Sequence, residues 1–206
     1  MYVPKRYELT DAAIIDKLIR ENPFATLVSD ASGVPTATHL PLQLFSDRGR
    51  RTLQGHFARA NNHWRSITPQ IEVLAIFTGP HTYISPRWYG HVNVPTWNYI
   101  AIHCYGKMRF LEQDELRAAL HELVSFHEGS GSEYCVETLP HDFLNAQMSA
   151  IVGFEIAVDR VEAAAKLSQN RNQQDFRNVV AELRARGDAS SLAVAEAMEK
   201  LAKPGG

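Results

Sequence analysis

The chain has 206 residues, of which 45% are hydrophobic and 21% are charged. These proportions are those of an ordinary globular protein and exclude a collagen-like, coiled-coil or wholly disordered chain. With 21 Lys and Arg against 23 Asp and Glu, the formal net charge of -2 supplies no strong positive field, so direct DNA binding is not supported by charge.

The start of the chain and its cysteines indicate the compartment. The opening segment, MYVPKRYELTD, has no apolar stretch after its basic residues, and no long apolar run that could cross a membrane occurs elsewhere. Cys104 and Cys135 lack the close spacing of a metal-binding pair. We therefore expect a cytoplasmic protein with reduced thiols and no membrane segment.

The first part of the chain predicts one helix followed by strands. Thr10 is the expected cap of an amphipathic helix that ends at Asn22 and Pro23. Three segments rich in β-branched and aromatic residues follow, and a three-stranded meander is their simplest arrangement. Pro35 and Pro41 cannot donate to a neighbouring strand, so the second segment should have an edge, a bulge or a ligand along part of its length. The three segments are residues 24–29, 34–45 and 52–58.

The rest of the chain adds long strands and further helices. Strands that do not alternate regularly with helices predict a mainly β protein with peripheral helices, in the α+β class, built on an antiparallel barrel or sheet. The expected elements are a short helix at 58–67, a buried strand at 71–77, a loop at 79–93, a long strand at 94–110, a helix at 113–127, a strand at 150–158 and helices from 175 to 203 with a break at Gly187.

Common catalytic and metal-binding motifs are absent from the sequence. His121 and His127 are each followed by Glu, but residues six positions apart do not share a helix face, and no third ligand stands at a diagnostic spacing. The chain also lacks a GxSxG elbow, a Walker loop and a GxGxxG motif after a strand. We therefore assign no catalytic residue and expect no metal.

Residues 79–99 are unusually dense in aromatic side chains and prolines. Aromatic rings on a stiffened segment bury a large area at low entropic cost and keep a polar edge, so they could form a stacking surface for a planar ligand. A plug at a barrel end or a dimer interface has the same composition, and both interpretations stay open. The rings are those of Tyr83, Trp88, Tyr89, Trp97 and Tyr99.

Two polar segments could also contact a ligand. In GHFARANNHW, Arg59 and the backbone N–H groups of a helix that starts near Asn61 could bind a phosphate, although an exposed arginine would look the same. In KLSQN, at residues 166–170, donors and acceptors follow a strand directly, and a turn with a helix cap is the alternative.

Five blocks of sequence resemble the PaiB family of FMN-binding negative transcriptional regulators. They are THLPL at 38–42, GHFARAN at 55–61, FTGPHTYISPRWY at 77–89, VPTWNY at 94–99 and KLSQN at 166–170. The resemblance begins at MYVP and extends to about Leu183. It implies an antiparallel split β-barrel of the FMN-binding type at residues 1–183 and a C-terminal helical extension at 184–206.

The resemblance also implies a homodimer that binds FMN in clefts at the subunit interface. By similarity to pyridoxamine phosphate oxidases, the phosphate and ribityl chain would lie against two segments, with Arg59 as the main phosphate ligand. These segments contain Thr38, His39 and Leu40, and then His56, Ala58, Arg59 and Asn61. The isoalloxazine would be lined by Trp97 and Asn98, and the cleft closed by Lys166, Ser168, Gln169 and Asn170. THLPLQ lacks the basic residues that the oxidases carry on this strand, so we expect a modest affinity for FMN.

Three functions follow from the resemblance. The first is a flavin-linked negative transcriptional regulator that acts directly or indirectly; its most basic helical stretch, RNVVAELRARG, is a poor DNA-reading helix. The second is an FMN-dependent oxidoreductase of unknown small-molecule substrate. The third is a haem-binding or haem-degrading split barrel, with axial-ligand candidates His39, His56, His81, His91 and His103.

Overall fold

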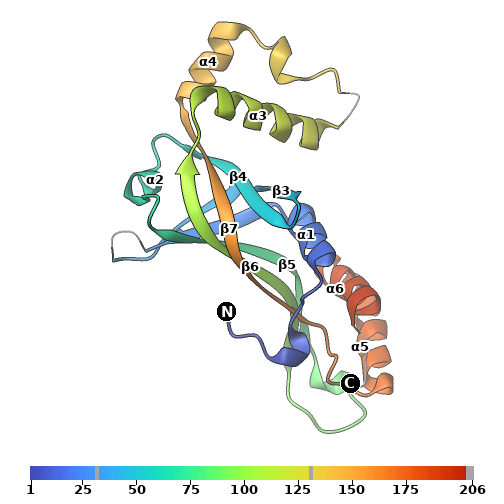
Figure 1. Ribbon diagram of the computed structural model, residues 1–206. Helices are drawn as coiled ribbons and strands as arrows, with labels where there is room; N and C mark the ends of the chain where they lie inside the picture. The colour runs from blue at the N-terminus through green and yellow to red at the C-terminus, as the bar shows by residue number, and fades with distance from the viewer. Residues whose placement is uncertain (31–32, 130–131, 203–206) are drawn as a thin grey trace. The chain divides into compact units, whose positions relative to one another are not determined.

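The computed structural model describes residues 1–30, 33–129 and 132–202 (Figure 1). The strands in the described residues are β1 (Phe24–Ser29), β2 (Thr36–Pro41), β3 (Gln43–Asp47), β4 (Arg50–Ala58), β5 (Glu72–Ile84), β6 (Thr96–Phe110) and β7 (Ile151–Lys166). The helices are α1 (Ala12–Glu21), α2 (His63–Ser66), α3 (Gln113–Glu128), α4 (His141–Ser149), α5 (Gln173–Arg186) and α6 (Ala189–Leu201). Short 3-10 helices span Lys5–Tyr7, Pro86–Trp88 and Val136–Thr138.

The chain divides into two compact units. The barrel unit consists of residues 19–76 and 104–161, and the helical unit consists of residues 1–18, 77–103 and 162–206. Strands β5, β6 and β7 contribute residues to both units. None of the helices in the described part of the chain has the length and apolar character that crossing a bilayer requires.

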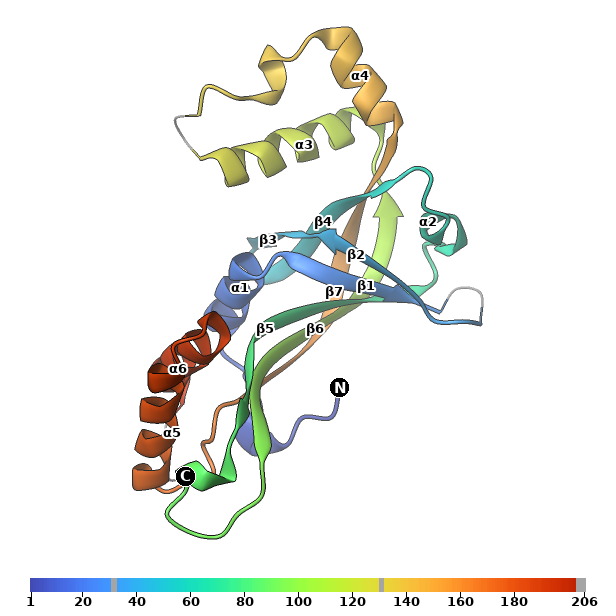
Figure 2. The same ribbon diagram turned by 180° about the vertical axis from the view of Figure 1, so that it is seen from behind.

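The order of the strands in the sheet requires the sheet to curl. Its strands follow one another as β2-β1-β5-β6-β7-β4-β3, and the pairings of β1 with β2 and β5, and of β4 with β3 and β7, are antiparallel. Strands β2 and β3 therefore lie at opposite edges, although only Leu42 separates them in the chain. Because one residue must connect the two edges, the sheet of the barrel unit closes on itself, and Figure 2 shows β2 passing close to β4.

Leu42 occupies the corner where the two edges meet. Its side chain is only 1% exposed, and its backbone N–H donates to the carbonyl oxygen of Pro23 at 2.8 Å. Gly55 on β4 makes room for it, since a Cβ at that position would lie 2.7 Å from Leu42 Cδ2 and 3.0 Å from the carbonyl oxygen of Pro41. The corner thus depends on a large apolar side chain that packs over a glycine.

Alternate residues of the curled strands fill the interior of the barrel unit, as the period of a half-buried strand requires. The rings of Phe57 on β4 and Phe154 on β7 lie 4.8 Å apart between centroids, and both side chains are buried. Strands β6 and β7 approach so closely at Gly106 that a Cβ there would collide with the carbonyl oxygen of Ala157. Other fully buried side chains are those of Leu27, Leu53 and Ile156.

Helices α3 and α4 lie between β6 and β7 in the sequence and are drawn in green-yellow and orange in Figure 1. We call this pair of helices the arm. The arm has its own small core, made of Leu116, Val136, Leu144 and Met148. Helix α3 starts with a capping box, in which the Glu112 side chain accepts from the backbone of Glu115 and the Glu115 carboxylate accepts from the N–H of Glu112 at 2.9 Å. The start of the helix is therefore fixed by local hydrogen bonds.

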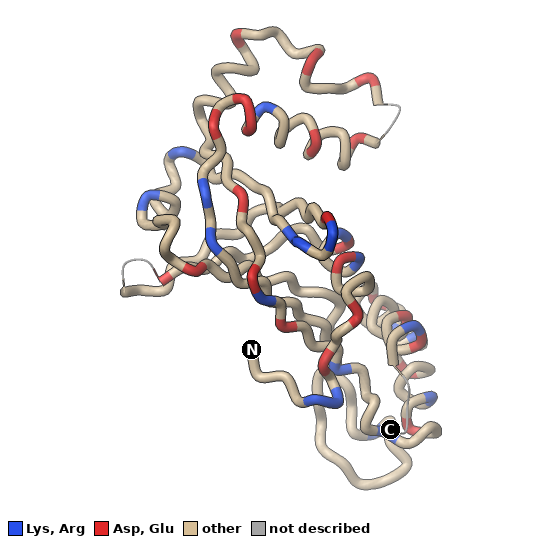
Figure 3. The backbone as a smooth tube through the Cα atoms, viewed as in Figure 1, with Lys and Arg blue, Asp and Glu red and all other residues tan. Residues whose placement is uncertain are grey.

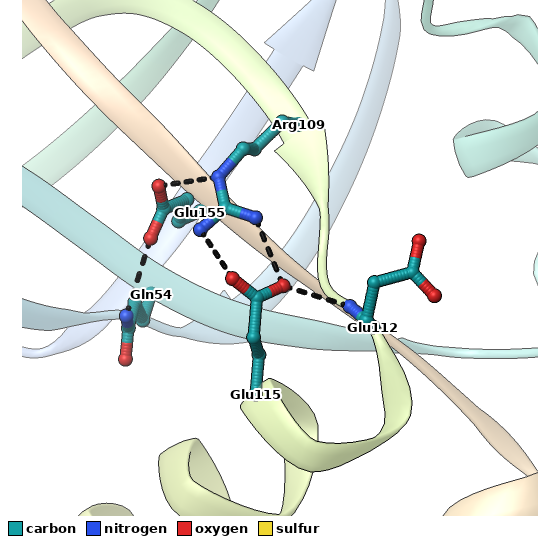
Figure 4. A network of polar contacts seen from close by, with 5 residues as sticks. All are labelled: Gln54, Arg109, Glu112, Glu115 and Glu155. Carbon is teal, nitrogen blue, oxygen red and sulfur yellow. Dashed lines mark hydrogen bonds and ion pairs between the residues drawn. The ribbon is translucent and has the colours of Figure 1, made fainter.

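A network around Arg109 joins the start of α3 to two strands (Figure 4). The guanidinium of Arg109 on β6 donates to both carboxylate oxygens of Glu115 at 2.9 Å and to Glu155 on β7 at 2.6 Å. Gln54 on β4 donates to the same Glu155 carboxylate at 3.4 Å. Hydrogen bonds from Arg109 lower the pKa of Glu115. Because these side chains are exposed or half-exposed, we expect the network to orient α3 more than to stabilise the protein.

The helical unit is built around α5 and α6. Gly187 adopts a left-handed conformation with φ of 71° and ends α5, and Asp188 then caps α6 by accepting from the N–H of Ser191 at 3.0 Å. The predicted boundary between residues 183 and 184 falls inside α5, and the division into a domain and an extension stays a prediction. The buried side chains of the two helices include Val179, Leu183, Val194 and Met198.

Several predicted elements are confirmed. The fold is a mainly β, antiparallel split barrel with peripheral helices, as expected. Strand β1 has the predicted bounds, and the predicted long strand, central helix and break at Gly187 correspond to β6, α3 and the turn between α5 and α6. The edge predicted from Pro35 and Pro41 is also confirmed, because β2 lies at one edge of the sheet.

Other expectations were wrong for identifiable reasons. The segment at 34–45 is two strands on opposite edges and not one strand of a meander, because Leu42 turns the chain into the interior. Asp11, and not Thr10, caps α1 by accepting from the N–H groups of Ala13 and Ile14. The expected loop at 79–93 begins as strand, since β5 continues to Ile84. Helix α4 was not expected. Residues 31–32 of one predicted turn, 130–131 of the predicted break and Lys203 of the last helix lie outside the described residues.

We predict that Leu42→Ala will lower the free energy of unfolding by about 2 to 5 kcal/mol, because it removes a buried side chain at the corner that joins both sheet edges. Urea unfolding monitored by circular dichroism measures this change. The matched control is Leu192→Ala, at a side chain that is 40% exposed and should cost no more than about 0.5 kcal/mol. Equal losses in the two variants would show that the corner has no special weight.

Candidate functional site

A cluster of polar side chains lies in the barrel unit where β1, β2 and the start of α2 meet. We call Ser29, Thr38, Asn61 and His63 the polar cluster. His63 Nδ1 lies 2.8 Å from Thr38 Oγ1, and His63 Nε2 lies 2.9 Å from Ser29 Oγ. The Asn61 amide donates to Thr38 Oγ1 at 3.1 Å, and the Asn61 carbonyl oxygen accepts from the backbone N–H of His63 at 3.0 Å.

The imidazole of His63 is the buried centre of this cluster. The residue is only 4% exposed, and its ring makes an edge-to-face contact with that of Phe57, with centroids 5.6 Å apart. Burial lowers the pKa of His63, so the ring is uncharged at neutral pH. Thr38 and Asn61 are only half-buried. The cluster therefore combines an inner histidine with an outer hydroxyl and an outer amide.

Arg59, which the sequence indicated as the main phosphate ligand, is held by backbone carbonyl groups. Its Nε donates to the carbonyl oxygen of Ser149 at 2.5 Å and its Nη2 donates to that of Ile151 at 2.9 Å. Its backbone N–H donates to Ala150. These bonds fix the guanidinium at the end of α4 and leave Nη1 without a hydrogen bond among the described residues. A role in phosphate binding stays a prediction.

The backbone amides that were expected to bind phosphate are used within the chain. The N–H of Asn61 donates to the carbonyl oxygen of Ala58, and that of His63 donates to the Asn61 side chain. Helix α2 has only four residues, so its dipole is small. These two amides are therefore engaged within the chain, and phosphate binding by the backbone of this segment stays a prediction.

The remaining predicted residues of the barrel unit point in different directions. Leu40 is buried in the interior, whereas His39 is exposed on the opposite face of β2, stacks on Phe24 and contacts Thr26 Oγ1 at 3.0 Å. Ala58 is exposed. His56 lines a small hollow between β4 and α3, where burial lowers its pKa. The structure thus brings Thr38 and Asn61 together and separates them from His39.

In the helical unit, Trp97 and Asn98 lie on opposite faces of β6. Asn98 is fully buried and contacts the hydroxyl of Ser168 through both ends of its side-chain amide. The Nδ2 atom of Asn98 donates to Ser168 Oγ at 3.0 Å, and Oδ1 of Asn98 accepts from Ser168 Oγ at 3.2 Å. Ser168 has a φ of 62°, which few residues other than glycine adopt. The side chains of Asn98 and Ser168 are therefore bonded to each other and hold the turn after β7.

The other residues of KLSQN complete the same turn. Gln169 accepts from the N–H of Leu167 at 2.7 Å and donates to the carbonyl oxygen of Ala165, and Asn170 is exposed. Lys166 Nζ donates to Thr96 Oγ1, and its pKa is lowered by burial and then by the charge of Arg171. Residues 166–170 therefore form a turn, which was the alternative interpretation of KLSQN. Their contact with a ligand stays a prediction.

Trp97, Tyr83 and His81 form an exposed aromatic patch on β5 and β6. The rings of Trp97 and Tyr83 lie nearly perpendicular, with centroids 6.3 Å apart, and the centroids of Trp97 and His81 lie 6.4 Å apart. Trp97 is 53% exposed and Tyr83 is 39% exposed. Part of the segment from 79 to 99 thus presents rings to its surroundings, as both sequence interpretations required.

The buried carboxylate of Asp175 holds the part of the segment 79–99 around Gly90. The sequence alone did not predict this contact. Asp175 is 2% exposed and accepts from the N–H of Gly90 at 2.7 Å and from the amide of Asn172 at 2.8 Å. Its carboxylate also lies 3.1 Å from Nδ1 of His91. The ring of Tyr89 stacks on that of His91, and the guanidinium of Arg171 lies 4.3 Å from the centroid of the Tyr89 ring. Asp175 therefore fixes the aromatic segment to the start of α5, a contact between residues 85 positions apart.

The histidines do not gather into a metal site. Among the described residues, no group of three or more His, Cys, Asp or Glu side chains is placed to hold a metal ion. Of the haem-ligand candidates, His81 contacts the carbonyl oxygen of Gly79 at 3.1 Å, while burial lowers the pKa values of His56 and His103. These placements single out no axial ligand.

Comparison with known proteins identifies the family. Residues 1–160 match the family model described as "Putative FMN-binding domain". The chain is 41% identical over 200 residues to the "Protease synthase and sporulation protein PAI 2" of Bacillus subtilis (strain 168), and the match covers 97% of each protein. It is also 26% identical over 223 residues to a protein of Emericella nidulans, with 87% of this chain and 89% of that protein covered.

Solved structures support the same fold. The chain superimposes on the FAD and heme binding protein from Mycobacterium smegmatis with a TM-score of 0.65 and 15% identity, covering 83% of this chain and 78% of that one. The flavocytochrome Anf3 from Azotobacter vinelandii gives a TM-score of 0.63 and 12% identity, with 85% and 78% covered. At these identities the likeness shows the fold alone. The family match over residues 1–160 and the 41% identity to PAI 2 show that the chain belongs to the PaiB family of FMN-binding proteins, and the solved structures agree with its split-barrel fold.

Proposed function

We propose that the protein is a flavin-linked negative regulator of transcription that works as a homodimer and binds the phosphate end of FMN at the polar cluster. The observation that carries this proposal is the outer hydroxyl of Thr38 beside the outer amide of Asn61, 3.1 Å apart and both half-buried. The family assignment supplies the cofactor. The 41% identity to PAI 2, whose name refers to sporulation, supports a role in regulation.

The donors at the cluster fit a phosphate that is bound mainly by neutral groups. Thr38 offers a hydroxyl, and Asn61 has a second amide hydrogen. Arg59, two residues before Asn61 in the chain, retains Nη1 after its bonds to two carbonyl groups and would add one charged donor. A guanidinium already held in place loses little conformational entropy when it binds an anion. This donor set agrees with the modest affinity expected from a strand without basic residues. When bound, FMN supplies hydride and electron chemistry.

The aromatic patch is the surface that we assign to the second copy of the chain. Trp97 and Tyr83 are rigid amphipathic side chains of the kind enriched at protein interfaces. Val92 and Val94 in the same segment are also largely exposed. Burying these side chains against a partner removes apolar area from water, which a monomer would leave exposed.

The charge distribution favours regulation without direct reading of DNA. In the helical unit, Arg184 pairs with Glu199 at 2.6 Å and Arg186 lies 3.6 Å from Asp188, so the two arginines at the end of α5 have acidic neighbours. Figure 3 shows Lys and Arg interspersed with Asp and Glu along α5 and α6. A recognition helix needs a positive surface that these pairs neutralise.

Thr38→Val should weaken FMN binding roughly ten- to a hundredfold, because a hydrogen bond to a charged phosphate is lost. Riboflavin, which lacks the phosphate, should bind the variant and the unchanged protein equally. Fluorescence titration of each flavin measures both affinities. The control is Thr36→Val on the same strand, whose hydroxyl donates to the carbonyl oxygen of Val34. Equal losses for FMN and riboflavin would place the phosphate elsewhere.

Trp97→Glu should convert the dimer into a monomer, because a carboxylate in the centre of the aromatic patch would be buried without a partner. Sedimentation equilibrium gives the mass of each form. Phe143→Glu on α4 provides a control, since Phe143 is 50% exposed but lies outside the patch. The assignment fails if the unchanged protein is monomeric or if only the control variant dissociates.

The regulatory role predicts a change in transcripts but no gel shift. Deleting the gene in its host should raise the level of a set of transcripts, and a copy carrying Thr38→Val should restore repression incompletely. Genomic fragments at low salt should show no retardation beyond that of a neutral control protein. Unchanged transcripts would remove the regulatory role, whereas salt-sensitive retardation would show that DNA is contacted directly.

A further inference from the structure

Both ring nitrogens of His63 contact hydroxyl groups that can either donate or accept. Nδ1 faces Thr38 at 2.8 Å and Nε2 faces Ser29 at 2.9 Å. The ring is held in place, because the backbone N–H of His63 donates to Asn61 and its carbonyl oxygen accepts from Ser66 at 2.8 Å. The direction of the two hydroxyl hydrogen bonds is therefore decided by where the imidazole carries its proton.

Counting hydrogens at Thr38 gives two arrangements for the neutral ring. With the proton on Nδ1, Thr38 Oγ1 accepts from both His63 and Asn61, and its own hydrogen is left to point outward. With the proton on Nε2, the Thr38 hydroxyl donates to Nδ1 and has no hydrogen left for a ligand. A phosphate oxygen can only accept, so it can bind Thr38 only in the first arrangement.

We propose that His63 is a positioning residue that turns Thr38 into a phosphate donor by holding a proton on Nδ1. The inference rests on the proposed placement of the FMN phosphate at the polar cluster. His63 does not touch the phosphate itself; it sets the direction of the Thr38 hydroxyl. Ser29 supports this arrangement, since its hydroxyl donates to Nε2 when the proton is on Nδ1.

The same geometry links phosphate binding to pH. A doubly protonated ring donates from both nitrogens and also leaves the Thr38 hydrogen outward, and its positive charge attracts an anion. The groups that contact the ring, Ser29 on β1, Thr38 on β2 and Phe57 on β4, are uncharged, as is Asn61, which bonds to Thr38 and to the backbone of His63. The basic residues nearest in sequence are engaged elsewhere, Arg59 with two carbonyl groups and Arg65 over the ring of Trp64.

The sign of the linkage follows from these contacts. Burial lowers the pKa of His63 in the free protein, and a bound anion raises it. Binding therefore takes up a proton, and the affinity of the wild-type protein for FMN should increase as the pH falls, by at most about tenfold per pH unit. The phosphate of FMN also titrates in this range, so the comparison must be made with a variant that lacks the imidazole.

Two substitutions separate the roles of the ring nitrogens. His63→Asn places an amide near the position of Nδ1 and can still donate to Thr38, whereas His63→Gln reaches toward Ser29 and leaves Thr38 without that donor. We measure FMN and riboflavin affinities of the wild type and both variants between about pH 5.5 and pH 8, where histidine titrates. Thermal unfolding confirms that each variant is folded.

We expect His63→Asn to bind FMN within roughly threefold of the wild type at neutral pH but to lose the extra increase at low pH, and His63→Gln to bind roughly ten- to a hundredfold more weakly. Identical affinities and pH profiles in all three proteins would overturn the inference. If Thr38→Val weakens FMN binding and the His63 variants do not, only the inference about His63 fails. If Thr38→Val has no effect either, the proposed phosphate site fails.

A spectroscopic measurement on the unchanged protein keeps the test independent of folding in the variants. Nitrogen-15 NMR of the imidazoles reports the protonated nitrogen, and the His63 signal is the one missing in His63→Asn. Adding FMN, or inorganic phosphate alone, should leave His63 protonated on Nδ1 or on both nitrogens. A ring that stays protonated only on Nε2 with FMN bound would contradict the proposal.

Discussion

The connection of two sheet edges through Leu42 is the constraint on which the rest of the barrel unit depends. Strands β2 and β3 are adjacent in sequence and at opposite edges in space, so the sheet has no flat alternative. The buried Leu42 side chain and the space above Gly55 allow the corner to close. Closure also brings β2 to the segment that follows β4, which is why Thr38 can accept a hydrogen bond from Asn61. The polar cluster is thus a product of the barrel's topology.

Few charged side chains surround the polar cluster, but several polar side chains of the protein are held in place by the fold. Arg59 is tied to two carbonyl groups, His63 is buried between two hydroxyls, and Asp175 secures the aromatic segment of the helical unit. Each of these groups loses its freedom when the chain folds and not when a ligand binds, which lowers the cost of binding. In the proposed site, neutral donors held in place by the fold take over the role of the basic residues that β2 lacks.

Local patterns predicted those parts of the fold that depend on neighbours in sequence. Pro35 and Pro41 indicated an edge strand, Gly187 indicated a helix end, and apolar alternation indicated β7. The break at Leu42 was missed because it follows from strand order and not from the residues around it. Arg59 was predicted as a phosphate ligand without its carbonyl partners, because the carbonyl groups that hold it lie 90 and 92 residues away. His63 lies just after the block GHFARAN, and its partners, 34 and 25 residues earlier, gave no local signal.

A crystal structure of the protein with FMN would locate the phosphate at the polar cluster or elsewhere. We expect a phosphate oxygen within hydrogen-bond distance of Thr38 Oγ1 and the Asn61 amide, about 2.7 to 3.2 Å away, while His63 keeps both of its hydroxyl contacts. Density for the phosphate at any other position, with Thr38 and Asn61 bonded only to each other and to His63, would contradict this placement.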